Sequence, residues 1–137
     1  MIAVLDYGMG NLRSVEKAIE HLGFRVSVQT DLRNADKLIL PGVGAFGAAM
    51  ERLAGMRKEL DALARSGAPI LGICLGEQLL FETSEEMGET AGLGLLPGRV
   101  VYLPKAIPGV KVPHMGWNAL ETTRPDGPNA GLEPGDQ

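Results

Sequence analysis

Residues 72–78, GICLGEQ, contain the only cysteine of this 137-residue chain. They follow an apolar run and precede a helical pattern, so Cys74 would stand on a sharp turn from a strand into a helix. Gly72 and Gly76 flank it, and bulky residues there would clash in such a turn. At a helix amino terminus, the dipole and the free N–H groups favour a thiolate. Cys74 is therefore a candidate nucleophile, and a small hydrophobic residue packed in a strand is the alternative.

A second glycine-rich turn, PGVGAFG at residues 41–47, likewise follows an apolar strand pattern and opens a helix. Its glycines would let the backbone turn N–H groups towards an anion. The N–H of Leu75 would also be free to donate to an oxyanion formed by attack at Cys74. In a parallel sheet, both turns would lie at the carboxyl ends of strands, the edge where such folds bind ligands. The second turn therefore favours the nucleophile over the packed cysteine.

The elements that position these turns alternate between strand and helix through the first eighty residues. Apolar runs predict strands, and apolar residues three and four apart predict amphipathic helices. The predicted strands are 2–5, 25–29, 37–40 and 69–73, with the last two buried; the predicted helices are 12–22, 46–67 with interruptions, and 75–81. This order predicts an α/β fold with a mainly parallel sheet and helices on both faces.

The carboxyl-terminal part of the sequence does not continue this alternation of strand and helix patterns. Residues 99–103 look like a strand, 112–118 could run into another, and the tail at 124–137 consists almost entirely of turn formers. We expect one domain over residues 1–137. Because no predicted helix or strand closes the chain, strand edges would lack cover, and we expect the domain to be truncated at its carboxyl end.

Composition restricts the function. Hydrophobic residues make up 45% and charged residues 22%, and no apolar run is long enough to cross a membrane. A single cysteine excludes a cysteine-rich zinc site and suits a reducing compartment, so we expect a cytoplasmic protein with no metal. A net charge of −4 without a basic cluster makes nucleic acid an unexpected partner.

Five segments, in this order and spacing, resemble the class I (triad) glutamine amidotransferases, and specifically the glutaminase subunits of imidazole glycerol phosphate synthase in histidine biosynthesis. They are DYGMGNLRSV at 6–15, LPGVGAFGAAM at 40–50, GICLGEQLLFE at 72–82, GLGLLPGRV at 92–100 and KVPHMGWN at 111–118. The resemblance covers residues 1 to about 121. It implies a flavodoxin-like, three-layer fold and an enzyme that needs no cofactor.

The resemblance also implies roles for particular residues. In this family a cysteine attacks the side-chain amide of glutamine, ammonia leaves, and water hydrolyses the resulting thioester. By position, the nucleophile is Cys74, the oxyanion donors are Val43 and Leu75, and the glutamine-binding residues are Gly42, Gly44, Gln78 and Glu86. Glu86 would pair with the α-ammonium group of glutamine. Without the motif, Gln78 and Glu86 would read as ordinary solvated residues.

The family passes its ammonia to a cyclase subunit built as a (β/α)₈ barrel, so the resemblance implies a heterodimer. The residues that match positions near the cyclase interface are Asn11, Pro113, His114, Trp117 and Asn118. Trp117 is the type of aromatic residue that anchors interfaces, although a core position suits a tryptophan as well.

One part of the family pattern is missing. The base is a histidine oriented by a glutamate in a downstream His-Pro-Glu motif, and this sequence has none. Of its two histidines, His21 ends a helix, where the dipole accounts for it, and His114 lies in the interface segment. We therefore expect little or no glutaminase turnover from this chain by itself. Glu77 is a smaller departure, because methionine is more usual there.

Two other functions stay open. GMGN at residues 8–11 could begin a dinucleotide-binding fingerprint, but Arg13 stands where the third glycine belongs. Alternatively, the chain could be a non-catalytic module that docks on the cyclase barrel. Such a module would keep the interface motifs but lack the catalytic histidine and glutamate, as this sequence does.

Overall fold

A computed structural model describes residues 1–103, 115–121, 127, 130–133 and 136. The chain divides into two compact units, residues 1–102 and 103–137, which are considered separately here. All regular elements of the described residues belong to the first unit. In chain order they are β1 (Ile2–Leu5), α1 (Leu12–His21), β2 (Val26–Gln29), β3 (Lys37–Gly42), α2 (Phe46–Leu53), the 3₁₀ turn η1 (Ala54–Met56), α3 (Arg57–Arg65), β4 (Ile70–Cys74), α4 (Leu75–Leu79), β5 (Thr83–Ser84), β6 (Thr90–Ala91) and β7 (Arg99–Val100).

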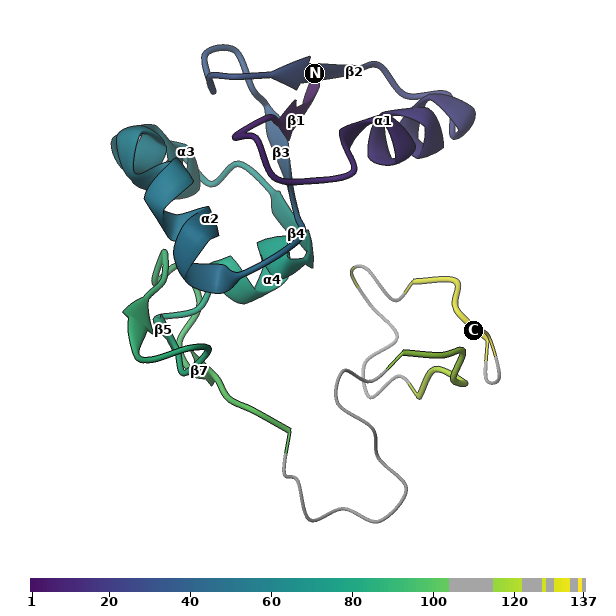
Figure 1. Cartoon of the computed structure of the whole chain (residues 1–137). Coiled ribbons are helices and arrows are strands. Elements are labelled where there is room, and N and C mark those ends of the chain that lie inside the picture. The colour runs from purple at the N-terminus through teal and green to yellow at the C-terminus, as the bar shows by residue number, and fades with distance from the viewer. Residues whose placement is uncertain (104–114, 122–126, 128–129, 134–135, 137) are drawn as a thin grey trace. The chain divides into compact units, whose positions relative to one another are not determined.

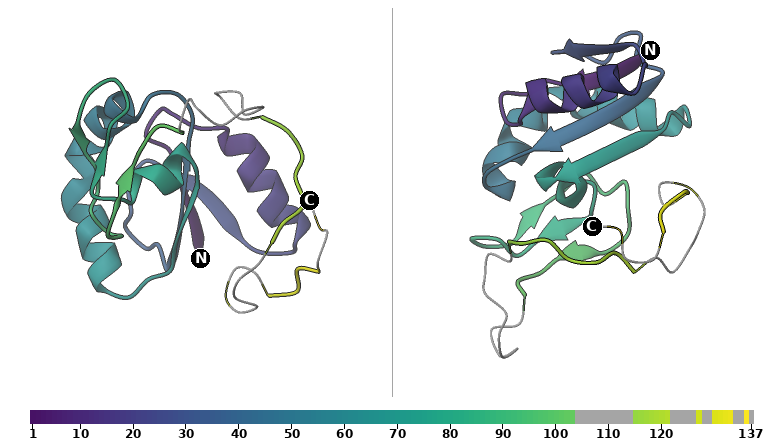
Figure 2. Two further views of the ribbon diagram at one scale, coloured as in Figure 1. Left: turned by 90° about the horizontal axis from the view of Figure 1, so that it is seen from below. Right: turned by 90° about the vertical axis from the view of Figure 1, so that its right-hand side faces the viewer.

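The main sheet is parallel and has the strand order β2-β1-β3-β4. The crossover from β1 to β2 runs in the opposite direction to the crossover from β3 to β4. Right-handed crossovers therefore put their helices on opposite faces. Accordingly, α1 lies on one face of the sheet and α2 and α3 lie on the other (Figures 1 and 2). The α/β class and the helices on both faces are confirmed.

Apolar side chains from the sheet and from α2, α3 and α4 form the core of this unit. Fully or almost fully buried residues include Leu5, Leu38, Leu40, Phe46, Leu53, Leu60 and Leu79. In α2 the buried residues Phe46, Ala49 and Leu53 are three and four apart, as expected for one face of a helix. The face of the sheet that carries α2 and α3 therefore holds the main core.

Residues 69–73 were predicted to form a buried strand, and the burial of that strand was predicted wrongly. The strand exists, but β4 pairs only with β3 among the described strands, and Leu71 and Ile73 are 49% and 38% exposed. An apolar run indicates a strand, but it does not distinguish a central from an edge position. The sequence pattern could not show which neighbours would cover β4.

A second, smaller sheet follows α4 and has the order β6-β5-β7. The strand predicted at 99–103 is shorter than expected, because β7 contains only Arg99 and Val100 and pairs with β5. This small sheet folds back on α4. The N–H groups of Leu93, Gly94 and Leu95 donate to the carbonyl oxygens of Leu79, Phe81 and Leu80, respectively. They satisfy carbonyls that a helix terminus leaves free.

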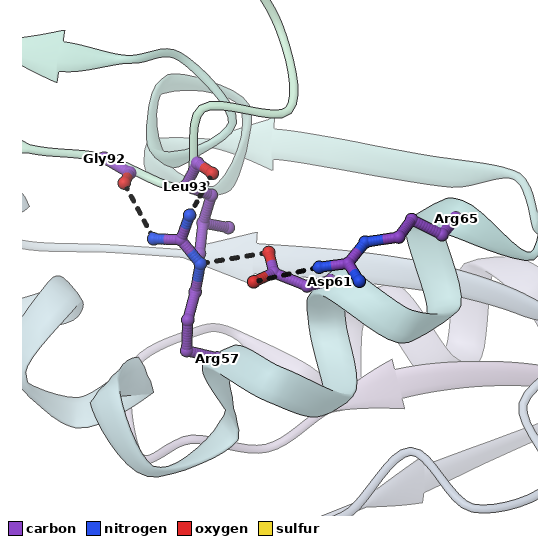
Figure 3. A network of polar contacts seen from close by, with 5 residues as sticks. All are labelled: Arg57, Asp61, Arg65, Gly92 and Leu93. Carbon is purple, nitrogen blue, oxygen red and sulfur yellow. Dashed lines mark hydrogen bonds and ion pairs between the residues drawn. The ribbon is translucent and has the colours of Figure 1, made fainter.

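Arg57, at the start of α3, ties that helix to the same segment (Figure 3). Its guanidinium donates to the carbonyl oxygens of Gly92 at 3.2 Å and Leu93 at 2.8 Å, and to Asp61 at 3.0 Å. Asp61 also faces Arg65 at 3.9 Å. Planar guanidinium groups suit several hydrogen bonds in fixed directions. Arg57 therefore connects α3 to the segment that caps α4, the helix that follows Cys74.

We predict that Arg57→Ala lowers the free energy of unfolding by about 1–2 kcal/mol, because three charge-assisted hydrogen bonds disappear at a partly exposed site. Urea unfolding followed by circular dichroism measures the change. Arg65→Ala is the matched control, because its single long ion pair is exposed and should contribute less than about 0.5 kcal/mol. Equal effects of the two substitutions would contradict the importance of the contacts to Gly92 and Leu93.

Candidate active site

Cys74 is the last residue of β4 and the residue that caps the amino end of α4. Its backbone has φ 57° and ψ −122°, a region that residues with a side chain rarely adopt. The thiol is free and exposed. A strained residue on a strand-to-helix turn, with its side chain presented to solvent, is the geometry of a nucleophile elbow. The packed-cysteine alternative is therefore wrong.

The flanking glycines are required by close backbone contacts. A Cβ at Gly72 would overlap the Cα of Glu77, and a Cβ at Gly76 would overlap the carbonyl oxygen of Leu40. Neither obstacle is the end of a flexible side chain, so neither can move aside cheaply. The sequence argument that larger residues would clash here is confirmed.

The PGVG turn, Pro41 to Gly44, lies beside the cysteine. In the register of the sheet, Gly42 of β3 pairs with Cys74 of β4. A Cβ on Gly42 would come within 2.6 Å of the backbone nitrogen of Gly76. Val43 follows and is half exposed, and Gly44 has a positive φ of 93°. The two glycine-rich turns are therefore adjacent at the carboxyl edge of the sheet, as predicted.

Leu75 is the first residue of α4, and its side chain is buried. The first N–H groups of a helix have no partner within the helix, so the Leu75 N–H has none there. Val43 and Leu75 each follow one member of the paired residues Gly42 and Cys74. Their N–H groups thus come from the two neighbouring strand ends that border the thiol. Their assignment as oxyanion donors stays a prediction.

Gln78 lies in α4, four residues after Cys74, and is exposed. Helix α4 begins at Leu75, directly after Cys74, so Gln78 lies in the first turn after the elbow. Nothing in the structure assigns it a ligand, and its role in binding glutamine stays a prediction.

Glu86 lies in the turn between β5 and β6 and is half buried. Its carboxylate accepts a hydrogen bond of 2.6 Å from the backbone N–H of Phe46, the first residue of α2. Its own N–H donates to the hydroxyl of Ser84, a completely buried side chain, at 3.1 Å. The structure therefore attaches Glu86 to the far end of the loop that contains Val43. The sequence did not indicate this contact, because 40 residues separate its partners.

Tyr7 is a second residue that the sequence argument missed. It follows β1, is buried, and donates a 2.8 Å hydrogen bond from its hydroxyl to the carbonyl oxygen of Pro41. Its oxygen would lie 2.9 Å from a Cβ on Gly42. Burial raises the pKa of Tyr7 to about 12, so the hydroxyl keeps its proton at neutral pH. Its position two residues after β1, at the carboxyl edge of the sheet, was the available signal.

The assignment of five residues to the cyclase interface stays a prediction, because these residues are divided between the two units and the part of the chain that is not described. The side-chain oxygen of Asn11 accepts a 3.4 Å hydrogen bond from the N–H of Ser14 and caps α1, which gives Asn11 a structural role in this chain. Trp117 and Asn118 belong to the second unit, and both are exposed. Pro113 and His114 lie outside the described residues.

His21 is the last residue of α1 and is exposed. Helix α1 starts after the carboxyl end of β1 and ends before the amino end of β2. Cys74 stands at the carboxyl end of β4, so His21 lies at the opposite edge of the parallel sheet. It is too far away to act as the base for Cys74, which agrees with its interpretation as a helix-terminal residue.

Among the residues that the structure describes, no helix is long and apolar enough to cross a membrane. The same residues contain no group of three or more histidine, cysteine, aspartate or glutamate side chains that could hold a metal ion.

A parallel α/β unit with a cysteine elbow beside a glycine-rich turn defines a class of candidate thiol enzymes, and comparison with known proteins narrows it. The family model for class I glutamine amidotransferases matches residues 3–130. A solved structure titled "Crystal structure of glutamine amidotransferase" has a TM-score of 0.59 and 24% identity and covers 69% of this chain and 52% of its own. At that identity the likeness supports the fold alone.

Several curated relatives carry the name "Imidazole glycerol phosphate synthase subunit HisH". The protein of Lactiplantibacillus plantarum is 53% identical over 97% of this chain and 66% of its own length. Those of Moorella thermoacetica and Syntrophotalea carbinolica are 54% and 48% identical, over 90% and 99% of this chain and 60% and 70% of their own lengths. The chain therefore belongs to the class I glutamine amidotransferase family, within the group of HisH subunits of imidazole glycerol phosphate synthase. It spans about two thirds of the length of these relatives.

Proposed function

We propose that this chain carries the nucleophile and oxyanion elements of a glutaminase that hydrolyses glutamine to glutamate and ammonia. The observation that supports this most directly is the strained, exposed Cys74, paired in register with Gly42 of the PGVG turn. A nucleophile needs exposure, and an oxyanion site needs backbone donors next to it. The family membership supplies the substrate class, because the name of the family specifies glutamine.

In the proposed reaction, the thiolate of Cys74 attacks the γ-carbonyl carbon of glutamine. The carbonyl oxygen becomes an oxyanion, which the N–H groups of Val43 and Leu75 stabilise. The C–N bond then breaks, ammonia leaves after taking up a proton, and a glutamyl thioester remains until water hydrolyses it. Glu86 would hold the α-ammonium group with the carboxylate oxygen that does not accept from Phe46, and Gln78 would contact the bound amino acid.

The ammonia would be passed to a cyclase subunit, as the names of the HisH relatives suggest for a subunit of a synthase. The protein would then act as a cytoplasmic heterodimer with a (β/α)₈-barrel partner, and the pair would act as a lyase in histidine biosynthesis. Direct transfer has a chemical advantage, because ammonia released into neutral water is mostly protonated and no longer nucleophilic.

The γ-(p-nitrophenyl) ester of L-glutamate tests the proposal without requiring a proton donor, because p-nitrophenolate leaves as an anion. We predict that the chain releases a rapid burst of about one equivalent of p-nitrophenolate, followed by slow turnover, because acylation needs only the thiolate and the oxyanion donors. Absorbance measures the burst, and mass spectrometry detects a glutamyl group on Cys74.

Cys74→Ala is the control for this measurement, and it should remove both the burst and the modification. A variant that still gives the burst, or an unaltered chain that gives none, would refute the proposed function. D-Glutamate γ-ester provides a second control, because a site built to bind the α-ammonium group of L-glutamine should acylate more slowly with the wrong enantiomer.

A docking module without catalysis is the second candidate, because the segment KVPHMGWN at residues 111–118 resembles the interface segment of the family. Such a module would co-purify with a cyclase subunit, and the pair would release no ammonia from glutamine. The burst experiment separates the two candidates, because a module that only docks has no reason to keep a reactive thiol. Membership of the amidotransferase family removes the basis for the dinucleotide-binding alternative.

A further inference from the structure

The loop from Pro41 to Phe46, which contains Val43, is held by side chains at both ends. At its start, the hydroxyl of Tyr7 donates to the carbonyl oxygen of Pro41 at 2.8 Å. At its far end, the carboxylate of Glu86 accepts from the N–H of Phe46 at 2.6 Å. Between these contacts lie two glycines, and Val43 is half exposed. The orientation of this loop therefore depends on the contacts at its ends.

The contact made by Tyr7 fixes a particular peptide group. A peptide is planar, and its C=O and N–H point in opposite directions. A hydrogen bond that fixes the carbonyl of Pro41 therefore also fixes the direction of the Gly42 N–H. It also limits the backbone rotation that would reorient the next peptide group, which contains the Val43 N–H. Gly42 is the residue that pairs with Cys74, so a change in the orientation of this peptide group would move backbone atoms directly beside Cys74.

Tyr7 is well suited to hold the Pro41 carbonyl in one orientation. Its ring is buried and belongs to the same core cluster as Leu40, Phe46 and Leu75. It approaches so closely that a Cβ on Gly42 would stand 2.9 Å from the hydroxyl oxygen. A ring locked by packing delivers its hydroxyl to one place, whereas a flexible side chain would not.

We propose that Tyr7 is a positioning residue for the reaction at Cys74, acting through the Pro41 carbonyl to set the backbone of the PGVG turn as an oxyanion site. This inference rests on the proposed thiol chemistry. Tyr7 itself touches neither the substrate nor the thiol in this role. It stabilises the arrangement of backbone donors that a developing oxyanion requires, and donors displaced by a fraction of an ångström lose much of their effect.

Two reactions of the same thiol test this role in the full 137-residue chain. Acylation by the γ-(p-nitrophenyl) ester of L-glutamate forms an S–C bond at a carbonyl carbon and passes through an oxyanion. Alkylation by iodoacetamide forms an S–C bond at a saturated carbon, iodide leaves with the electron pair, and no oxyanion develops. A change in the PGVG turn alone should affect the first reaction and leave the second unchanged.

We expect Tyr7→Phe to slow acylation at saturating ester about tenfold, with the half-saturating ester concentration and the rate of alkylation unchanged. Phenylalanine keeps the packed ring and removes only the donor. Tyr7→Met, which fills the space with an apolar side chain, should give the same selective loss and serves as a second variant if Tyr7→Phe does not fold. Tyr102→Phe is the matched control, because its hydroxyl contacts the N–H of Met87 rather than the PGVG turn.

Unchanged acylation in both Tyr7 variants would overturn the proposal, and so would an equal slowing of acylation and alkylation, which would indicate a general loss of structure. If the unaltered chain is acylated no faster than Cys74→Ala, the proposed function itself fails and the role of Tyr7 fails with it. That result is distinct, because it is seen before any Tyr7 variant is made.

Discussion

Gly76→Ala is expected to lower the free energy of unfolding by about 3 kcal/mol or more, a large fraction of the total stability of a chain of this size. A Cβ at this position would overlap the carbonyl oxygen of Leu40 and would approach the carbonyl carbon of Pro41 to 3.1 Å. Both obstacles are backbone atoms of β3, the central strand that pairs with β4. Removing these overlaps would require β3 and α4 to move apart, which would also displace Cys74.

Gly47→Ala is the matched control for this prediction. Gly47 lies in α2, and the atom nearest to an added Cβ is the hydroxyl oxygen of Thr90 at 3.8 Å, an ordinary contact. Alanine in a helix should stabilise this variant by about 0.5–1 kcal/mol. Urea unfolding of the two variants and the unaltered chain measures both effects. A Gly76→Ala chain as stable as the unaltered one would show that β3 and α4 do not approach as the structure has them.

The second large effect concerns glutamine itself. We expect the 137-residue chain to release ammonia from glutamine at least about a thousandfold more slowly than it releases p-nitrophenolate from the γ-(p-nitrophenyl) ester of L-glutamate. An amide nitrogen must be protonated to leave, and a thioester needs a base to be hydrolysed. His21 lies at the edge of the sheet opposite Cys74, and the sequence has no His-Pro-Glu motif.

A coupled glutamate dehydrogenase assay measures this turnover, and the ester burst described above shows in the same preparation that the thiol is competent. Added imidazole should speed hydrolysis of the glutamyl thioester, because it supplies the missing base from solution. Ammonia release as fast as the burst from the ester, abolished by Cys74→Ala, would show that some residue of this chain serves as the base.

The local pattern was sufficient for much of the fold. The amphipathic spacing of α1 and the apolar runs of β1 and β3 correspond to the elements that the structure contains. The flanking glycines located the elbow, because a Cβ on Gly72 of β4 would overlap α4 and a Cβ on Gly76 of α4 would overlap β3. Each of these features depends on residues close together in the sequence.

The predictions failed where a feature depends on distant neighbours. The apolar residues of β4 indicated a strand but not that Leu71 and Ile73 would remain exposed at the edge of the sheet. Residues 99–103 read as a full strand, yet only two of them pair, because β5 offers only two partners. Strand length and burial are set by pairing, which the sequence of one segment does not contain.

The sequence by itself determined that this is an α/β protein of the amidotransferase type and that Cys74 stands on a turn between a strand and a helix. Only the tertiary structure decided which groups surround that turn. Tyr7 meets Pro41 across 34 residues, and Glu86 meets Phe46 across 40. The physical reason is that a turn's conformation follows from local steric limits, whereas the partners of a side chain depend on how separate elements pack.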